Sequence, residues 1–80
     1  MNTIKSIEDI IISQKGCLPK NGELITWGEM DSLDFEELLA SIEKHFEIVI
    51  PDNEFILDNF FSIESLSKMV KRSFLLDLAE

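Results

Sequence analysis

Cysteine and basic residues are scarce in this sequence, and tyrosine is absent. The only cysteine, Cys17, cannot form an internal disulfide or a cysteine metal cluster, and a reducing compartment is its simplest setting. The chain has 7 lysine and arginine residues against 16 aspartates and glutamates, which gives a formal net charge of −9. We therefore expect no binding to nucleic acid through phosphate neutralisation, and we expect partners with basic surfaces.

Long hydrophobic runs are missing as well. Residues 1–15 contain several isoleucines, but Lys5, Glu8 and Asp9 interrupt them, which is typical of an amphipathic helix rather than of a signal peptide. No other segment approaches the length that crosses a bilayer. The sequence therefore predicts a cytoplasmic protein that does not insert into a membrane.

The length limits the architecture to one domain. Residues 1–80 lie near the lower size at which a single core is stable without metals or disulfides. Hydrophobic residues make up 45% of the chain, so a folded core is expected despite the charge. A catalytic cleft with its own walls is hard to fit into a domain of this size. We predict a monomer of one domain that is not itself an enzyme.

The spacing of apolar residues predicts an all-α fold. The first helix is expected to have Thr3 as its N-cap and to end near Gly16. A long loop over residues 17–30 follows it. Two apolar residues of this loop, Leu24 and Trp27, are expected to pack over the ends of the helices.

Three further helices complete the predicted fold. The second covers residues 32–46 with Asp31 as its N-cap, a short third one covers residues 53–57 after Asp52, and the last begins after Ser62. The expected architecture is a small four-helix bundle with three longer helices, one short helix and a long loop between the first two. Three aromatic residues are expected to add bulk to its core: Phe55, Phe60 and Phe61.

The second helix has two faces of different chemistry at about 100° per residue. One face is an apolar stripe made of Phe35, Leu38, Leu39, Ile42 and Phe46. Leu33 points directly away from that stripe. The sector around Leu33 is mostly acidic and holds Glu36, Glu37, Ala40, Glu43, Lys44 and Glu47. This sector is either an ordinary solvated surface or a docking face for a basic partner.

Ser32 places a side-chain hydroxyl group in the first turn of this helix. A serine there often caps the helix, but Asp31 already supplies a cap and leaves Ser32 free. His45, the only histidine, lies about 20 Å further along the helix at 1.5 Å per residue, so it cannot activate Ser32 as a hydrolytic nucleophile. A phosphodiester on Ser32 is physically reasonable, because the positive end of the helix dipole favours an anion.

Residues 31–52 resemble an acyl carrier protein. The resemblance rests on Asp31-Ser32-Leu33-Asp34, on the amphipathic helix that ends in Phe46-Glu47, and on Ile50-Pro51-Asp52; the rest of the chain is similar in helix pattern and length. It implies the acyl-carrier type of four-helix bundle, with phosphopantetheine attached to Ser32. A phosphopantetheinyl transferase would deliver the arm from coenzyme A with Mg²⁺, which Asp31 would help to hold. Leu33 would be the docking anchor.

The resemblance also implies what the protein does. The thiol of the arm would carry acyl or aminoacyl groups as thioesters, and a loading ligase, synthases and transferases with basic docking surfaces would act on them. Glu36, Trp27 and Gly28 depart from the bacterial fatty-acid carriers. The pathway therefore stays open between fatty acid, polyketide and other lipid biosynthesis and the loading of an amino acid. As an alternative to packing only in the core, either Leu24 or Trp27 would border a cavity for the acyl chain.

The acidic composition suggests two further hypotheses, a metal site and an interaction module. EF-hand loops that start at Asp31 or Asp52 place apolar residues at ligand positions, so no specific metal site is predicted. The alternative function is an acidic helical interaction module, an adaptor or inhibitor that presents the Leu33 face and is never modified.

Overall fold

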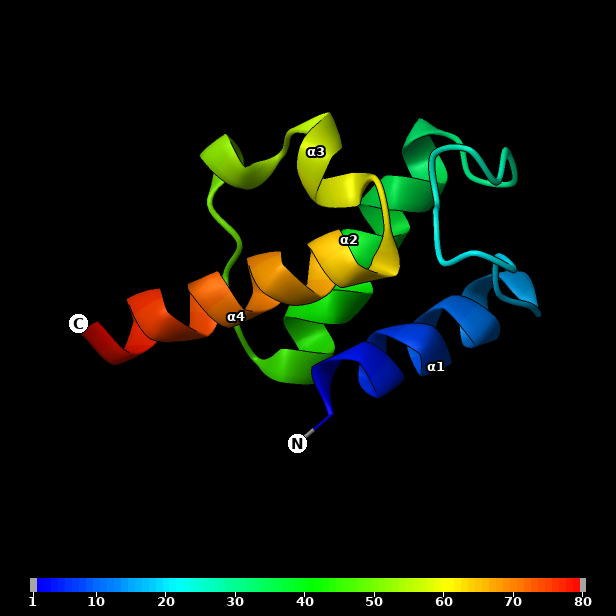
Figure 1. Cartoon of the computed structure of the whole chain (residues 1–80). Coiled ribbons are helices and arrows are strands. Elements are labelled where there is room, and N and C mark those ends of the chain that lie inside the picture. The colour runs from blue at the N-terminus through cyan, green and yellow to red at the C-terminus, as the bar shows by residue number, and fades with distance from the viewer. Residues whose placement is uncertain (1, 80) are drawn as a thin grey trace.

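The fold is all-α, as predicted. A computed structural model describes residues 2–79, with side chains up to residue 75, and contains α1 (Thr3–Lys15), α2 (Ser32–Phe46), α3 (Leu57–Phe60) and α4 (Ile63–Ala79). A 3-10 turn, η1 (Asp52–Glu54), precedes α3. α1 packs against both α2 and α4, and α3 packs on α4 (Figure 1). Three longer helices and one short helix are thus confirmed.

The N-cap of the first helix lies one residue before the expected one. Asn2 is the N-cap, and its side chain accepts a hydrogen bond from the backbone N–H of Lys5 at 3.0 Å. The prediction of Thr3 as the cap is wrong: Thr3 is the first helical residue and is buried, and asparagine caps a helix at least as well as threonine. Gly16 ends the helix as predicted, with a left-handed φ of 86° that glycine adopts without strain.

The short third helix differs from its prediction. Instead of one helix over residues 53–57, η1 is separated from α3 by Phe55 and Ile56. Ile56 is extended, with φ −125° and ψ 152°, and therefore interrupts the helical path. The other boundaries are confirmed, since α2 follows Asp31 and Ser62 caps α4 by accepting the N–H of Ser65 at 3.1 Å.

The core lies between α1, α2 and α4. Its buried residues are Ile7, Ile11, Leu24, Leu38, Leu39, Ile42, Phe46, Ile48, Ile50, Ile63, Leu66, Met69 and Val70. Leu24 is buried and Trp27 packs partly on the core, as expected. Phe60 also packs against the core, but Phe55 and Phe61 are 46% and 42% exposed, so the prediction for these two was wrong. Their backbone belongs to short segments at the edge of the bundle.

The long loop is tied to the start of α4. The backbone N–H of Leu24 donates to the carbonyl of Phe61 at 2.8 Å, and that of Ile63 donates to the carbonyl of Gly22 at 2.9 Å. These bonds bring the loop across the bundle, next to the segment that carries α3. Within residues 2–79, no helix has both the length and the apolar character needed to span a bilayer.

Candidate functional site

Ser32 is exposed at the first position of α2, where the helix is capped by its neighbours. The side chain of Asp31 accepts the backbone N–H of Asp34 at 2.9 Å, and the side chain of Asp34 accepts the backbone N–H of Asp31 at 3.1 Å. This reciprocal capping box satisfies the helix end without using Ser32. The hydroxyl is therefore accessible at the positive end of the helix dipole.

The end of α1 fixes this first turn. Lys15 Nζ lies 3.2 Å from Asp34 Oδ2, and the side-chain amide of Gln14 donates to the carbonyl of Asp34 at 2.8 Å. The capping hydrogen bond from Asp31 and the hydrogen bond from Lys15 lower the pKa of the Asp34 carboxyl. At neutral pH Asp34 is ionised, so both the box and the ion pair are formed. The backbone next to Ser32 is thus held both by the capping box of α2 and by two side chains of α1.

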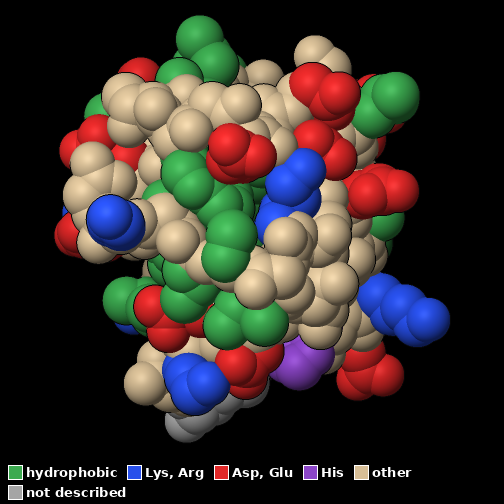
Figure 2. Space-filling model, turned by 90° about the vertical axis from the view of Figure 1, so that its right-hand side faces the viewer, with side chains coloured by type: hydrophobic (Ala, Val, Ile, Leu, Met, Phe, Trp, Pro, Cys, Tyr) green, Lys and Arg blue, Asp and Glu red, His purple; other side chains and the backbone are tan. Residues whose placement is uncertain are grey.

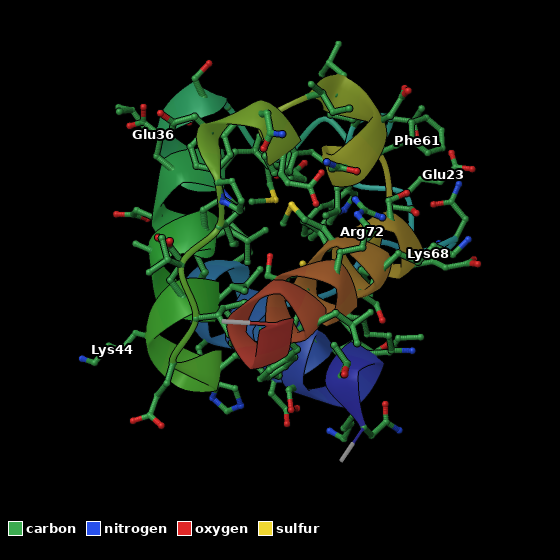
Figure 3. All side chains as sticks on the ribbon, turned by 90° about the vertical axis from the view of Figure 1, so that its left-hand side faces the viewer. Glu23, Glu36, Lys44, Phe61, Lys68 and Arg72 are labelled. Atoms are coloured by element: carbon green, nitrogen blue, oxygen red, sulfur yellow. The ribbon has the colours of Figure 1, made fainter. Side chains whose placement is uncertain are left out.

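The exposed face of α2 runs away from this turn. Leu33 is 70% exposed. Glu36, Glu37, Ala40 and Glu47 are exposed as well, and Figure 3 shows Glu36 and Lys44 projecting from α2 away from the bundle. The remaining member of the predicted docking face, Glu43, is only half exposed, and its carboxylate accepts the backbone N–H of Ile50 at 2.9 Å. Glu43 thus supports the connector after α2.

A cleft of about 300 Å³ opens beside Ser32. It lies between α2, the loop and the segment that carries α3, and it is mostly apolar. Its walls are Ile25, Ser32, Phe35, Glu36, Leu39, Phe55, Leu57 and Phe60. The rings of Phe35 and Phe60 are 5.7 Å apart, and those of Phe55 and Phe60 are 6.4 Å apart. Neither Leu24 nor Trp27, the residues suggested by the sequence, lines this cleft.

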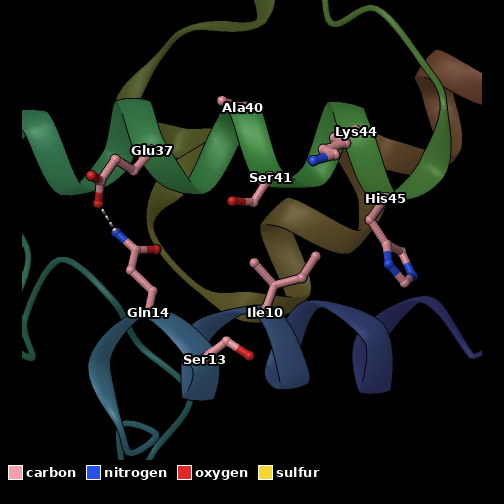
Figure 4. A pocket seen from close by; sticks show the side chains of 8 residues that line it. All are labelled: Ile10, Ser13, Gln14, Glu37, Ala40, Ser41, Lys44 and His45. Atoms are coloured by element: carbon pink, nitrogen blue, oxygen red, sulfur yellow. Dashed lines mark hydrogen bonds between the residues drawn. The ribbon is translucent and has the colours of Figure 1, made fainter.

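A wider groove lies on the other side of α2. Figure 4 shows it between α1 and α2, where Gln14 donates to the carboxylate of Glu37 at 3.4 Å. The groove is open and has a volume of about 730 Å³. Its lining residues are Ile10, Ser13, Gln14, Glu37, Ala40, Ser41, Lys44 and His45. The exposed side of α2 is therefore a ridge between two hollows.

Other sequence candidates lie away from this site. Cys17 is exposed and lines a separate hollow to which Trp27 also contributes. The ring of His45 packs edge-on against Phe46 at the far end of α2. Among the residues that the structure describes, no group of three or more histidine, cysteine, aspartate or glutamate side chains could hold a metal ion.

The face that carries the long loop combines apolar and acidic groups. Figure 2 shows hydrophobic side chains gathered over its middle, with acidic side chains around them. No family model, no curated protein and no solved structure matches the chain. The function is therefore inferred from the residues themselves.

Proposed function

We propose that the protein is a carrier that holds acyl or aminoacyl groups as thioesters on a phosphopantetheine arm attached to Ser32. The observation that carries this proposal is the accessible hydroxyl of Ser32, which lies outside the capping box and beside Leu33. An exposed hydroxyl on a rigid first turn can be presented to a second enzyme. The resemblance of residues 31–52 to acyl carrier proteins supports the same assignment.

The surroundings of Ser32 suit a phosphodiester on its oxygen. Transfer from coenzyme A would join Ser32 Oγ to phosphorus, break the pyrophosphate bond and release the nucleotide bisphosphate. The positive end of the helix dipole at the start of α2 favours the new anion. Asp31 and Asp34 are close and acidic, and Lys15 neutralises part of that charge. Asp31 is the residue that would help to hold Mg²⁺ during the transfer.

The cleft and the ridge support the two other tasks of a carrier. The cleft beside Ser32 offers an apolar surface on which part of a tethered cargo can lie. The ridge of α2 offers Leu33 with Glu36 and Glu37 nearby, a pattern that suits enzymes with a basic docking surface. Partner enzymes would load, extend and release the cargo in the cytoplasm, and the carrier would act as a monomer.

Intact mass after modification tests the proposal. After incubation with coenzyme A, Mg²⁺ and a broad-specificity phosphopantetheinyl transferase, we expect a gain of one phosphopantetheine group. Ser32→Ala should abolish the gain, whereas Ser41→Ala, at another exposed serine of α2, should retain it. A folded protein that gains no mass would instead support the interaction module that is never modified. A gain that persists in Ser32→Ala would place the arm on another residue.

Two substitutions of Asp31 can separate its role in capping α2 from its proposed role in the transfer of phosphopantetheine. Asp31→Ala removes the cap and should lower the free energy of unfolding by about 1 kcal/mol, whereas Asp31→Asn should nearly preserve it. If Asp31 helps to hold Mg²⁺, both variants should be modified more slowly than the wild type. Urea unfolding and the initial rate of mass gain measure the two effects. An unchanged rate in Asp31→Asn would restrict Asp31 to capping.

A further inference from the structure

One wall of the cleft beside Ser32 is formed by the segment of residues 52–60, which we call the outer wall. No apolar side chain of this segment is fully buried. Within residues 52–58 no side chain is buried, and Leu57 is 72% exposed. The backbone hydrogen bonds of this segment stay local, such as Glu54 N–H to the carbonyl of Pro51 and Phe55 N–H to the carbonyl of Asp52. Burial alone therefore does not fix the wall residues Phe55 and Leu57 against the bundle.

A polar network from α4 holds the wall instead. Arg72 Nε donates to Glu54 Oε2 at 2.9 Å, and a terminal nitrogen of Arg72 donates to Asn59 Oδ1 at 2.9 Å. Asn59 is buried, and its amide donates to the carbonyl of Glu54 at 2.6 Å. Arg72 thus binds η1 and α3 at once. Figure 3 shows Arg72 on the side of α4 that faces them.

The network is charged at neutral pH and partly shielded from water. The Glu54 side chain is 18% exposed, and that of Arg72 is 47% exposed. The hydrogen bond from Arg72 lowers the pKa of the Glu54 carboxyl, which keeps it ionised. An arginine that binds two acceptors in a fixed geometry holds them better than an isolated surface ion pair does.

We propose that Arg72 is a positioning residue for the cleft beside Ser32. It holds residues 52–60 against α4 through Glu54 and Asn59, and it thereby sets how far the cleft shields a cargo tethered to Ser32. The shielding depends on the proposed carrier function, whereas the positioning of the wall does not. Arg72 acts through the wall and not on the reacting atoms.

Amide hydrogen exchange of the unmodified protein tests the positioning. Arg72→Gln should accelerate exchange in residues 53–60 by about tenfold, because a hydrogen-bonded charge is lost. The matched control is Lys68→Gln, which removes the same charge one turn earlier on α4 and breaks only the exposed pair with Glu64. Exchange in α1 and α2 should be the same in both variants. If Arg72→Gln does not fold, Arg72→Lys, which keeps the charge but not the double contact, should give a smaller acceleration in the same residues.

Thioester cleavage tests the shielding. With an octanoyl group loaded on the arm, hydroxylamine should cleave the thioester faster in Arg72→Gln than in Lys68→Gln. The cleavage rate should rise by a factor similar to the acceleration of amide hydrogen exchange, because both reactions need the outer wall to open. Equal exchange in the two variants, or acceleration spread over α1 and α2, would overturn the positioning role. Local acceleration with equal cleavage would overturn the shielding. A failure to modify Ser32 would refute the carrier function, and the exchange result would still decide the role of Arg72.

Discussion

Leu33→Ala is expected to reduce the rate constant kcat/KM for modification of Ser32 by about tenfold or more, which is the loss typical of a central apolar anchor in a protein interface. The side chain is 70% exposed and lies next to Ser32, so a partner that reaches Ser32 must cover it. Because Leu33 contributes nothing to the core, its loss should change the free energy of unfolding by no more than about 0.5 kcal/mol.

The matched control for this effect is Val49→Ala. Val49 is also a highly exposed apolar residue, at 75%, but it lies in the connector after the far end of α2. Its loss should leave modification unchanged. The rates are compared with a fixed concentration of transferase and coenzyme A. Equal rates for Leu33→Ala and the wild type would refute the docking role of Leu33, even if Ser32 is modified.

Leu38→Ala is expected to lower the stability of the protein strongly, in contrast to Leu33→Ala. Leu38 lies on the buried side of the same helix and is 1% exposed. Removing a buried leucine side chain leaves a cavity and typically costs about 2–5 kcal/mol. For a domain of this size that is a large part of the total stability, so the urea midpoint should fall strongly or the variant should be partly unfolded.

The two leucine variants on α2 control each other. Leu33→Ala should impair modification without impairing stability, and Leu38→Ala should lower stability. Unfolding in urea, followed by far-UV circular dichroism, measures the second effect. Similar midpoints for the two variants would contradict the placement of Leu38 in the core.

The longer helices could be predicted because their signals are local. α2 has an acidic cap at Asp31, an apolar stripe with helical period and an end after Phe46, and each of these is visible in the sequence. The segment around α3 could not be predicted in the same way. One turn of helix has little stability of its own, and its position depends on Arg72, which comes 18 residues after Glu54.

In the candidate site, too, the features that depend on local sequence could be predicted and those that depend on tertiary structure could not. The exposure of Ser32 and Leu33 follows from helical geometry once the start of α2 is known. The cleft does not, because Ile25, Phe35 and Phe55 come from three separate segments that only the tertiary structure brings together. The hydrogen bond from the backbone of Ile50 to Glu43 could not be predicted for the same reason. The sequence predicts Glu43 only as a member of the acidic docking face around Leu33.

The capping box at the start of α2 has a consequence for how such a protein can diverge. Asp31 and Asp34 keep the helix in place, whereas Leu33, Glu36 and Glu37 make no contribution to that cap. Under the proposed carrier function, these surface residues could be exchanged to select a different set of enzymes while the scaffold and Ser32 stay intact. The residues proposed to select partners and those that stabilise the helix would then vary independently along a single fifteen-residue helix.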